Sequence, residues 1–442
     1  MRQHFFSKSR KRILNIKINF FFLLIVFSTI CLNMEGAVIT EGTLFRMDTI
    51  HEIRLTFSEK GYWDTLENRY NRFHEIDTLD RFMTMAEIKI DGVSFDSIGV
   101  KLKGNYTYSI STKKKPMKID MNAFVKGKRY EGLRAINLSN EFPDPSMLRN
   151  TVAYKILRDA GLIVPRSSFA KVFVNDVYWG LYSVIEQIDK SYLSMHFKDS
   201  EGELIKGVAS SLFWLPDDTL SFWRNFEIKN KNAPVTWSRL IAFAEKVNTT
   251  SADVFYDSLS GEFDFDSYLP VFAADIIFNN WDSYFFGQNY YLYRDSTESR
   301  YHFLAWDYNN SLNTKTGKED FQILSGGSNS YLLSLPLPLK ILNNKKLKGQ
   351  YFDELCRINK IMSSDSIQTF ILKMHKLIRP ALLKDSGKVM TIQQYDESLQ
   401  KFISLSDIGF TGLLNFIHNR TIQVNSMLKK VGHSCENPGI KK

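Results

Sequence analysis

The chain of 442 residues is 44% hydrophobic and 14% aromatic, so it can bury a large core, as one large domain or as two lobes. This aromatic content argues against a disordered chain. The formal net charge is +9, but residues 1–36 hold six Lys or Arg and one acid, which leaves about +4 for the rest. Because this charge is mild and no basic stripe carries interleaved aromatics, we expect no nucleic-acid partner.

Residues 1–36 have the pattern of a secretory signal peptide. A basic start is followed by the 13-residue apolar run FFFLLIVFSTICL and by the small residues Gly36 and Ala37. A membrane-spanning helix needs about 20 apolar residues, so this run is short for one. An uncleaved anchor is the alternative, and it would be the only membrane contact. We therefore expect a secreted or cell-envelope protein.

Two cysteines, Cys356 and Cys435, remain once Cys31 leaves with the signal peptide. In an exported protein they could form one disulfide, although the sequence does not say whether they meet. The scattered His residues lack the spacing of a zinc site. The common phosphate-loop motifs and the G-x-S-x-G motif of serine hydrolases are also missing from the sequence.

Alternating apolar and polar residues predict a twisted antiparallel sheet in the first half of the chain. The expected strands lie at 50–57, 86–103, 116–124, 130–140 and 167–189, with tight turns at 91–92 and 175–176. One prominent helix is expected over 144–161. Asp144 would cap it, Pro145 would take its first position and Gly161 would end it. Its buried face would carry Leu148, Val152 and Ile156.

The second half of the chain predicts mainly helices. Residues 264–280 are apolar nearly all round, as in a buried helix, and several amphipathic helices follow between 338 and 431. Between them, YYLYRD and YHFLAW predict a short hairpin. The architecture is thus a sheet-rich N-lobe and a helical C-lobe, an α+β fold, with the hairpin where the lobes meet. Clefts between lobes commonly bind small ligands.

Three polar residues surround this hairpin in the order Asp282, Asn289, Asp307. In kinase-type phosphoryl transfer, one Asp orients the attacking hydroxyl, an Asn a few residues later holds a metal, and a second Asp bridges Mg²⁺ to the phosphates. Oxygen ligands without His or Cys suit Mg²⁺ or Mn²⁺. In isolation, such a trio is more often structural, with Asp282 capping a turn, Asn289 starting a strand and Asp307 beginning an Asx-turn.

Several stretches together resemble the CotH family, secreted or spore-coat proteins with an atypical protein-kinase fold. The resemblance runs from roughly residue 50 to 430 and is carried by GVKLKGN (99–105), KKKPMKID (113–120), GLRAINLSNEFPDPSMLRN (132–150), VFVNDVYWGLYSVIEQID (172–189), NNWDSYFFGQNYYLYRD (279–295) and LAWDYNNS (304–311). It implies a bilobal kinase-like domain at 45–432, with lobes at about 45–190 and 191–432, and a C-terminal tail at 433–442.

The resemblance also implies an activity and a set of site residues. The activity is transfer of phosphate from ATP, with Mg²⁺ or Mn²⁺, to Ser or Thr of a secreted or coat protein. By position, Asp282 is the catalytic Asp, and Asn289 and Asp307 hold the metal. The expected nucleotide contacts are Lys115, its rival Lys103, and Glu186 at the edge of the site or between the lobes.

The sequence departs from the family pattern at two places. The family's second motif is usually PWDYD, whereas here Ala305 replaces the Pro and Asn309 the second acid. The loop from Asp282 to Asn289 is also two residues longer than the family's tighter form. Both departures keep open an alternative, a pseudokinase that acts as a cell-surface structural or adhesion protein.

Overall fold

A computed structural model describes residues 42–73, 82–214, 219–230, 233–314, 334–405 and 408–435. The predicted signal peptide at 1–36 and most of the predicted tail lie outside these residues. Among the residues described, no helix is both long and apolar enough to cross a membrane. The chain from Leu44 onward forms one compact unit.

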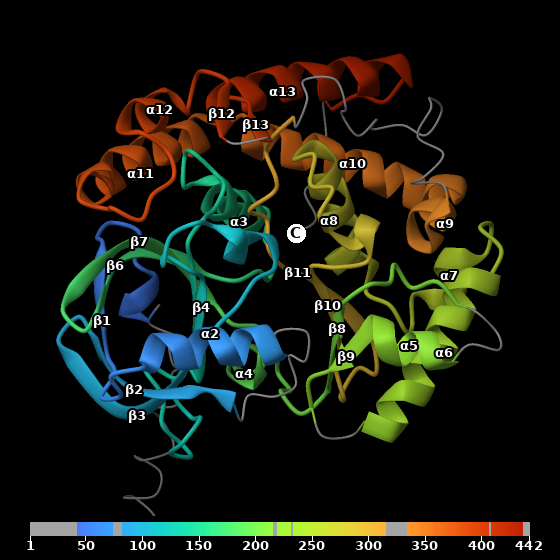
Figure 1. Cartoon of the computed structure of the whole chain (residues 1–442). Helices are drawn as coiled ribbons and strands as arrows, with labels where there is room; N and C mark the ends of the chain where they lie inside the picture. Colours follow the sequence, from blue (N-terminus) through green and yellow to red (C-terminus); the bar gives the residue numbers. More distant parts are fainter. Residues whose placement is uncertain are drawn as a thin grey trace, which may run out of the picture. The chain divides into compact units, whose positions relative to one another are not determined.

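Seven strands in the first half of the chain close into a barrel, in the order β1-β2-β3-β4-β5-β7-β6 (Figure 1). They are β1 (His51–Thr56), β2 (Thr84–Ile90), β3 (Val93–Leu102), β4 (Met117–Asp120), β5 (Ala135–Ser139), β6 (Ser167–Val174) and β7 (Val177–Glu186). Neighbouring strands are antiparallel except β1 and β6, which pair in parallel. The predicted sheet is confirmed, but its closure through this parallel pair was not predicted.

The two predicted tight turns join strands of this barrel. Asp91 and Gly92 connect β2 to β3 with φ values of 45° and 94°, and Asn175 and Asp176 connect β6 to β7 with 46° and 64°. Positive φ at both central residues is the geometry of two-residue hairpins, and Gly, Asn and Asp adopt it at low cost. Local turn chemistry therefore determined these hairpins.

The prominent helix of the first half, α3, spans Arg149–Asp159 and begins later than predicted. The Asp144 carboxylate accepts hydrogen bonds from the backbone N–H groups of Ser146, Leu148 and Arg149, at 2.9 to 3.0 Å. These bonds hold 144–148 in a turn ahead of the helix, so Asp144 is not the helix N-cap and Pro145 is not its first residue.

The other features predicted for α3 are confirmed. Gly161, just beyond the helix, has a φ of 79°, a left-handed conformation that favours glycine. Leu148, Val152 and Ile156 are fully buried. The helix packs against β6 on one side and against α10 and α11 on another, so it joins the barrel to the helical part of the chain (Figure 1).

Two helices of the first half were not predicted. They are α2 (Tyr62–Phe73) and α4 (Lys190–His196), besides the short 3-10 turns η1 (Thr43–Phe45) and η3 (Tyr106–Ser109). Helix α2 packs on β2 and β3. Its sequence, YWDTLENRYNRF, places Tyr62, Leu66 and Tyr70 at helical spacing among polar residues, a pattern that the sequence analysis missed.

The second half is mainly helical, as predicted. Its helices are α5 (Thr219–Asn225), α6 (Ala233–Thr249), α7 (Phe255–Leu259), α8 (Phe265–Ile277), α9 (Pro336–Asn343), α10 (Lys345–Met362), α11 (Asp365–Leu383), α12 (Ile392–Glu397) and α13 (Leu413–Lys430). The predicted buried helix is α8, in which all but two residues are buried. Its core is continuous with that of α3, whereas the barrel interior forms a second buried cluster.

A four-stranded sheet lies beside these helices, in the order β11-β10-β8-β9. Its strands are β8 (Glu203–Gly207), β9 (Phe226–Ile228), β10 (Tyr290–Arg294) and β11 (Tyr301–Ala305), and a separate two-stranded ribbon joins β12 (Ile403–Leu405) to β13 (Ile408–Phe410). The hairpin β10–β11 is the predicted one, but β8 and β9 were not predicted. Sheets and helices together confirm the α+β class, while the division into two lobes stays a prediction.

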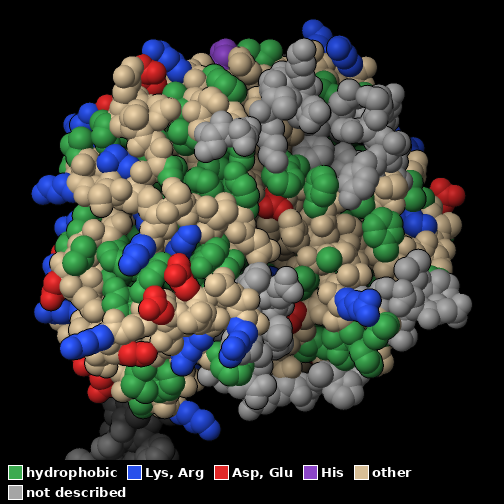
Figure 2. Space-filling view, in the orientation of Figure 1, with side chains coloured by type: hydrophobic (Ala, Val, Ile, Leu, Met, Phe, Trp, Pro, Cys, Tyr) green, Lys and Arg blue, Asp and Glu red, His purple; other side chains and the backbone are tan. Residues whose placement is uncertain are grey.

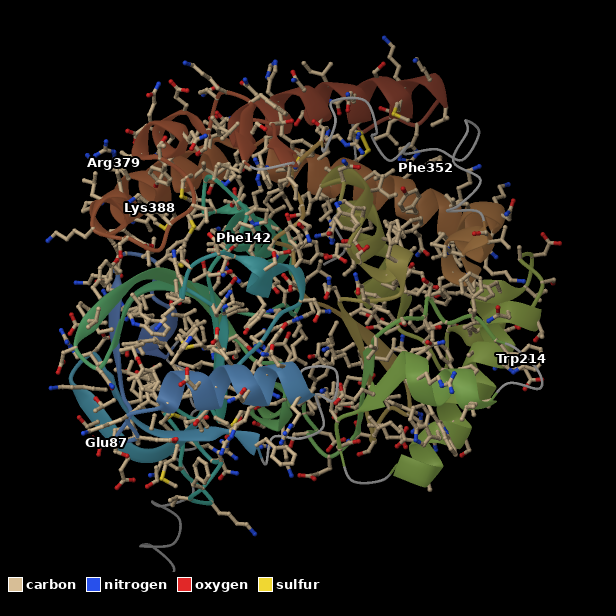
Figure 3. All side chains as sticks on the ribbon, in the orientation of Figure 1. Glu87, Phe142, Trp214, Phe352, Arg379 and Lys388 are labelled. Carbon is tan, nitrogen blue, oxygen red and sulfur yellow. A yellow bond between two sulfur atoms is a disulfide. The ribbon has the colours of Figure 1, made fainter. Side chains whose placement is uncertain are left out.

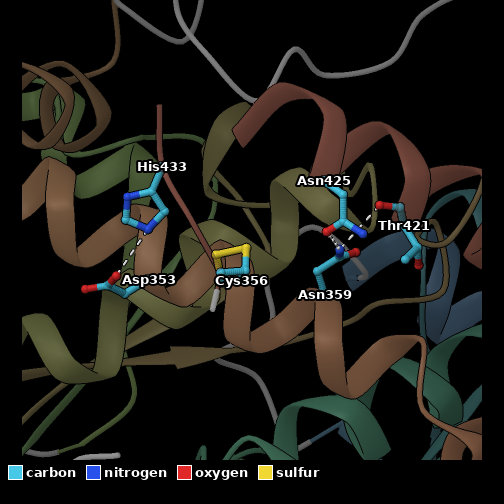
Figure 4. Close-up of a disulfide and its surroundings, with 7 residues drawn as sticks. Asp353, Cys356, Asn359, Thr421, Asn425 and His433 are labelled. Carbon is cyan, nitrogen blue, oxygen red and sulfur yellow. Dashed lines mark hydrogen bonds and ion pairs between the residues drawn. A yellow bond between two sulfur atoms is a disulfide. The ribbon is translucent and has the colours of Figure 1, made fainter. Parts of the chain in front are cut away.

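A disulfide joins Cys356 in α10 to Cys435, with 5.4 Å between their Cα atoms (Figure 4). The two thiols that the sequence left unassigned therefore meet. Next to the bridge, the His433 ring lies 3.2 Å from the Asp353 carboxylate, so a second contact holds this end of the chain on α10. A bridge of this kind is typical of proteins folded in an oxidising compartment.

Candidate functional site

The end of the β10–β11 hairpin brings Asn289 and Asp307 together. Tyr290 pairs with Ala305 as the last pair of the hairpin, and the Trp306 N–H donates to the Asn289 carbonyl at 3.1 Å. Asn289 and Asp307 both have left-handed backbones, with φ values of 58° and 57°. Non-glycine residues in this conformation are uncommon and cluster at functional sites.

The loop before β10 returns Asn289 to Asp282. The Asn289 side-chain amide donates to the Asp282 carbonyl oxygen at 2.8 Å, which closes the loop on itself. Inside it, η4 (Tyr284–Phe286) ends at Gly287, where φ is 76° and an added Cβ would lie 2.5 Å from the backbone nitrogen of Ser210. The longer loop is thus compatible with a contact between Asp282 and Asn289.

Two neutral amides hold the Asp282 carboxylate. Gln288 donates to one carboxylate oxygen, and Asn310 donates to the other at 2.8 Å. Asp282 keeps some exposed surface. Neither amide neutralises its charge, so the carboxylate is oriented but remains able to accept a proton or a hydrogen bond. The sequence analysis missed Gln288 and Asn310, although both are close neighbours of the residues it chose.

Helix α3 supports Asp307 from behind. The Asp307 N–H donates to the Tyr154 hydroxyl at 3.0 Å, and the next N–H, of Tyr308, donates to the Asn150 side chain at 3.1 Å. Burial is the main cause that raises the pKa of the Asp307 carboxyl. The positive charges of Lys103 and Lys206 lower this pKa, and the negative charge of Asp282 raises it further. The two acids therefore lie within electrostatic reach of each other. A bound cation would favour the ionised form of both.

Lys103 is the lysine of the barrel that acts on Asp307. Its ammonium donates to the Asn137 side-chain oxygen at 3.0 Å and lies 5.4 Å from the centre of the Trp306 ring. The Asn137 amide in turn donates to Gln187 at 3.1 Å. This chain of contacts positions a positive charge, just beyond the end of β3, against the segment that carries Asp307.

Lys115 and Glu186 have other partners. The Lys115 ammonium donates to the carbonyls of Tyr108 and Ile110 at 2.8 and 2.5 Å, which braces the loop between β3 and β4. The buried Glu186 forms an ion pair with Arg166 at 2.7 Å within the barrel. In the described part of the chain, neither side chain bonds to Asp282, Asn289 or Asp307, so of the two lysine candidates the structure brings Lys103 to the acids.

A buried carboxyl that the sequence analysis did not single out lies just before α3. Glu141 is 1% exposed and has a φ of 53°, and among the described residues neither of its side-chain oxygens has a hydrogen-bond partner. Burial, followed by the nearby charge of Asp144, raises its pKa to about 8. It lines a small pocket with Phe142 and Lys388, both labelled in Figure 3. Its raised pKa therefore favours the protonated, uncharged carboxyl at neutral pH.

Basic and acidic side chains are mixed over the barrel face of the molecule. Figure 2 shows Lys and Arg among Asp and Glu on that face, rather than gathered into one stripe. The expectation that nucleic acid is not a partner stays a prediction.

Comparison with known proteins gives a family and several relatives. The family model of the CotH kinase protein matches residues 100–406. The inner spore coat protein H of Bacillus subtilis is 24% identical over 292 residues, which cover 62% of this chain and 76% of that protein. A spore coat protein homolog 1 of Rhizopus delemar is 21% identical over 258 residues, 55% of this chain but only 41% of the relative's own length.

Two solved structures show a weaker likeness. The Helicobacter pylori proinflammatory kinase CtkA is 11% identical, with a TM-score of 0.27 over 64% of this chain and 92% of its own. The HipA–HipB–DNA complex of Shewanella oneidensis gives 11% identity and a TM-score of 0.23, over 68% and 58%. TM-scores this low do not support a shared fold. The family match, however, spans well over half of the sequence, and this chain belongs to the CotH kinase protein family.

Proposed function

We propose that this protein is an exported protein kinase that transfers the γ-phosphate of ATP to Ser or Thr of envelope or extracellular proteins. The observation that carries the proposal is the meeting of Asp282, Asn289 and Asp307 at one end of a hairpin, with Lys103 acting on Asp307. The CotH family assignment supports it, and so do two relatives named as spore coat proteins.

The residues at this hairpin end fit a magnesium or manganese nucleotide. Asp307 offers carboxylate oxygens, and Asn289, whose amide nitrogen already donates to Asp282, offers its amide oxygen. Hard oxygen donors of this kind suit Mg²⁺ or Mn²⁺. When bound, the metal nucleotide supplies the phosphoryl group and a counter-charge for its oxygens. Lys103 would bind phosphate as a point charge.

Asp282 would orient the hydroxyl of the acceptor protein. Its carboxylate is held by Gln288 and Asn310, so its direction is set before any substrate arrives. A carboxylate in hydrogen-bond reach of the attacking hydroxyl aligns it and can accept its proton. Positioning and proton transfer are each worth about 10²–10⁴-fold in rate or more.

The test compares Asp282→Asn with the wild-type mature chain. We expect the variant to bind ATP with Mg²⁺ or Mn²⁺ within a few-fold of the wild type, and to lose nearly all transfer of labelled phosphate to protein. Binding and transfer are measured on the same preparation. Normal transfer by Asp282→Asn would refute the role given to this loop.

A second function, that of a pseudokinase serving as a structural or adhesion protein at the cell surface, is favoured by one observation. Asn309 occupies the position of the family's second acid, and its neutral amide adds no negative charge for a second metal. It is also buried, at 8% exposure. If the wild type binds ATP but transfers phosphate neither to itself nor to any acceptor, this second function is the correct one.

A further inference from the structure

The sheet that presents Asn289 and Asp307 also carries a lysine at the same end. In β10, Tyr290 pairs with Gly207 of β8 and with Ala305 of β11, and the next residue, Tyr291, pairs with Lys206 and Leu304. Lys206 therefore lies one residue pair from the end of the sheet. At that same end the chain leaves β11 and continues to Asp307. Figure 1 shows this sheet between the barrel and helices α5 and α6.

The strand register also determines the face on which Lys206 lies. Directly paired residues in neighbouring strands project from the same face, so Lys206 and Tyr291 share one. The Tyr291 ring packs edge-on against Trp306, with 6.1 Å between the ring centres, and the Lys103 ammonium lies over Trp306. The strand register thus places Lys206 beside Tyr291, while Lys103, which directly follows β3 of the barrel, lies over Trp306.

Both lysines belong to segments that meet next to Asp307. Lys103 lies over the Trp306 ring, and Lys206 is paired with Tyr291, which packs on that ring. Lys206 keeps part of its surface exposed. A nucleoside triphosphate beside Asp282 and Asp307 would bring several like charges together, and the sequence has no glycine-rich phosphate loop with which to offset them. Positive side chains must therefore share that role with the metal.

We propose that Lys206 is a second phosphate-binding residue, which holds the polyphosphate of a nucleoside triphosphate from the side opposite Lys103. This inference rests on the proposed function. It adds Lys206, from the four-stranded sheet, to a site whose other lysine, Lys103, comes from the barrel.

The test measures nucleotide binding to the mature chain by calorimetry, with Mg²⁺ and with ATP, ADP or AMP. Lys206→Met, which keeps an apolar stem, should weaken binding of ATP by about 10-fold or more, as expected for the loss of a charge-assisted contact. Binding of AMP should change much less. Lys206→Arg should restore most of the affinity for ATP. Lys89→Met, on the exposed face of β2, is the matched control and should leave all three affinities unchanged.

A second measurement needs no variant. Acetylation of wild-type lysines, followed by mass spectrometry, should show that Mg²⁺ with ATP protects Lys206 and Lys103 but not Lys89. Equal ATP affinity of Lys206→Met and the wild type, or acetylation of Lys206 unaffected by ATP, overturns the proposal while the proposed function survives through Lys103. If the wild type binds no nucleotide, the proposed function fails and this proposal fails with it.

Discussion

Replacing Glu141 with Gln should change how the stability of this protein depends on pH. In the folded protein burial raises the pKa of Glu141 from its ordinary value of 4.5 to about 8. Between these two pH values the unfolded chain loses this proton while the folded chain keeps it. The folded state then binds more protons, so the free energy of unfolding decreases as pH rises from 4.5 to 8 and is independent of this group outside that window.

The magnitude follows from the same interval. At about 1.4 kcal/mol per pH unit, Glu141 costs about 5 kcal/mol once the pH exceeds 8, and about 3 kcal/mol at pH 7. Gln cannot ionise, so the stability of Glu141→Gln relative to the wild type should increase by about 1.4 kcal/mol per pH unit across the window. The buried amide adds a constant offset, because its N–H groups also need partners.

The assay is chemical denaturation of the oxidised mature chain at several pH values between 4.5 and 9. The difference between variant and wild type is the quantity to follow, because burial also raises the pKa of Asp275, to about 7, and this affects both proteins equally. Glu87→Gln, at an exposed position of β2 labelled in Figure 3, is the control and should run parallel to the wild type. If the Glu141→Gln difference is constant with pH, then the folded carboxyl is ionised and the reasoning from burial is wrong.

Three further predictions concern the metal, the disulfide and the N-terminus. Asp307→Ala should abolish metal-dependent ATP binding in calorimetry while the thermal unfolding transition persists; unchanged affinity would return Asp307 to a purely structural role. Cys435→Ser should lower the free energy of unfolding by up to about 4 kcal/mol, because the bridge to Cys356 closes a long loop, and reduction of the wild type should have the same effect. The opposite result, equal stability with and without reductant, would show that the bridge contributes nothing. Intact-mass measurement on protein from the native host should find residues 1–36 removed, and a full-length mass in a soluble cytoplasmic fraction would contradict this.

Local chemistry made much of the fold predictable. The turns at Asp91–Gly92 and Asn175–Asp176 need positive φ, which few residues adopt cheaply, and the apolar helix α8 has nowhere to lie but the core. The start of α3 could not be predicted, because Pro145 behind a capping Asp fits a helix start as well as it fits the observed turn. Contacts across the chain, such as the hydrogen bond from the Arg149 guanidinium to the Thr411 carbonyl at 2.6 Å, hold the observed arrangement.

The part of the candidate site that depends on the order of residues along the chain could be predicted. The part that depends on where the lysine side chains point could not. Asp282, Asn289 and Asp307 lie close along the chain, so one hairpin is enough to assemble them. The sequence alone does not distinguish Lys115 from Lys103 as a phosphate-binding residue. Only the fold shows that the Lys115 ammonium donates to carbonyls of its own loop. Lys206 stands alone in a strand that gave no recognisable pattern.

The parallel pair of β1 and β6 has a consequence for how the chain folds. Ile53 pairs with Val172, so one edge of β1 stays open until a strand more than a hundred residues further along has been synthesised or translocated. Pairing over such a distance is slow, and an open strand edge can recruit the strand of another chain. The outward positions of β1 carry Glu52 and Arg54, and charged side chains on an edge disfavour such recruitment. These two charges therefore matter most before the barrel has closed.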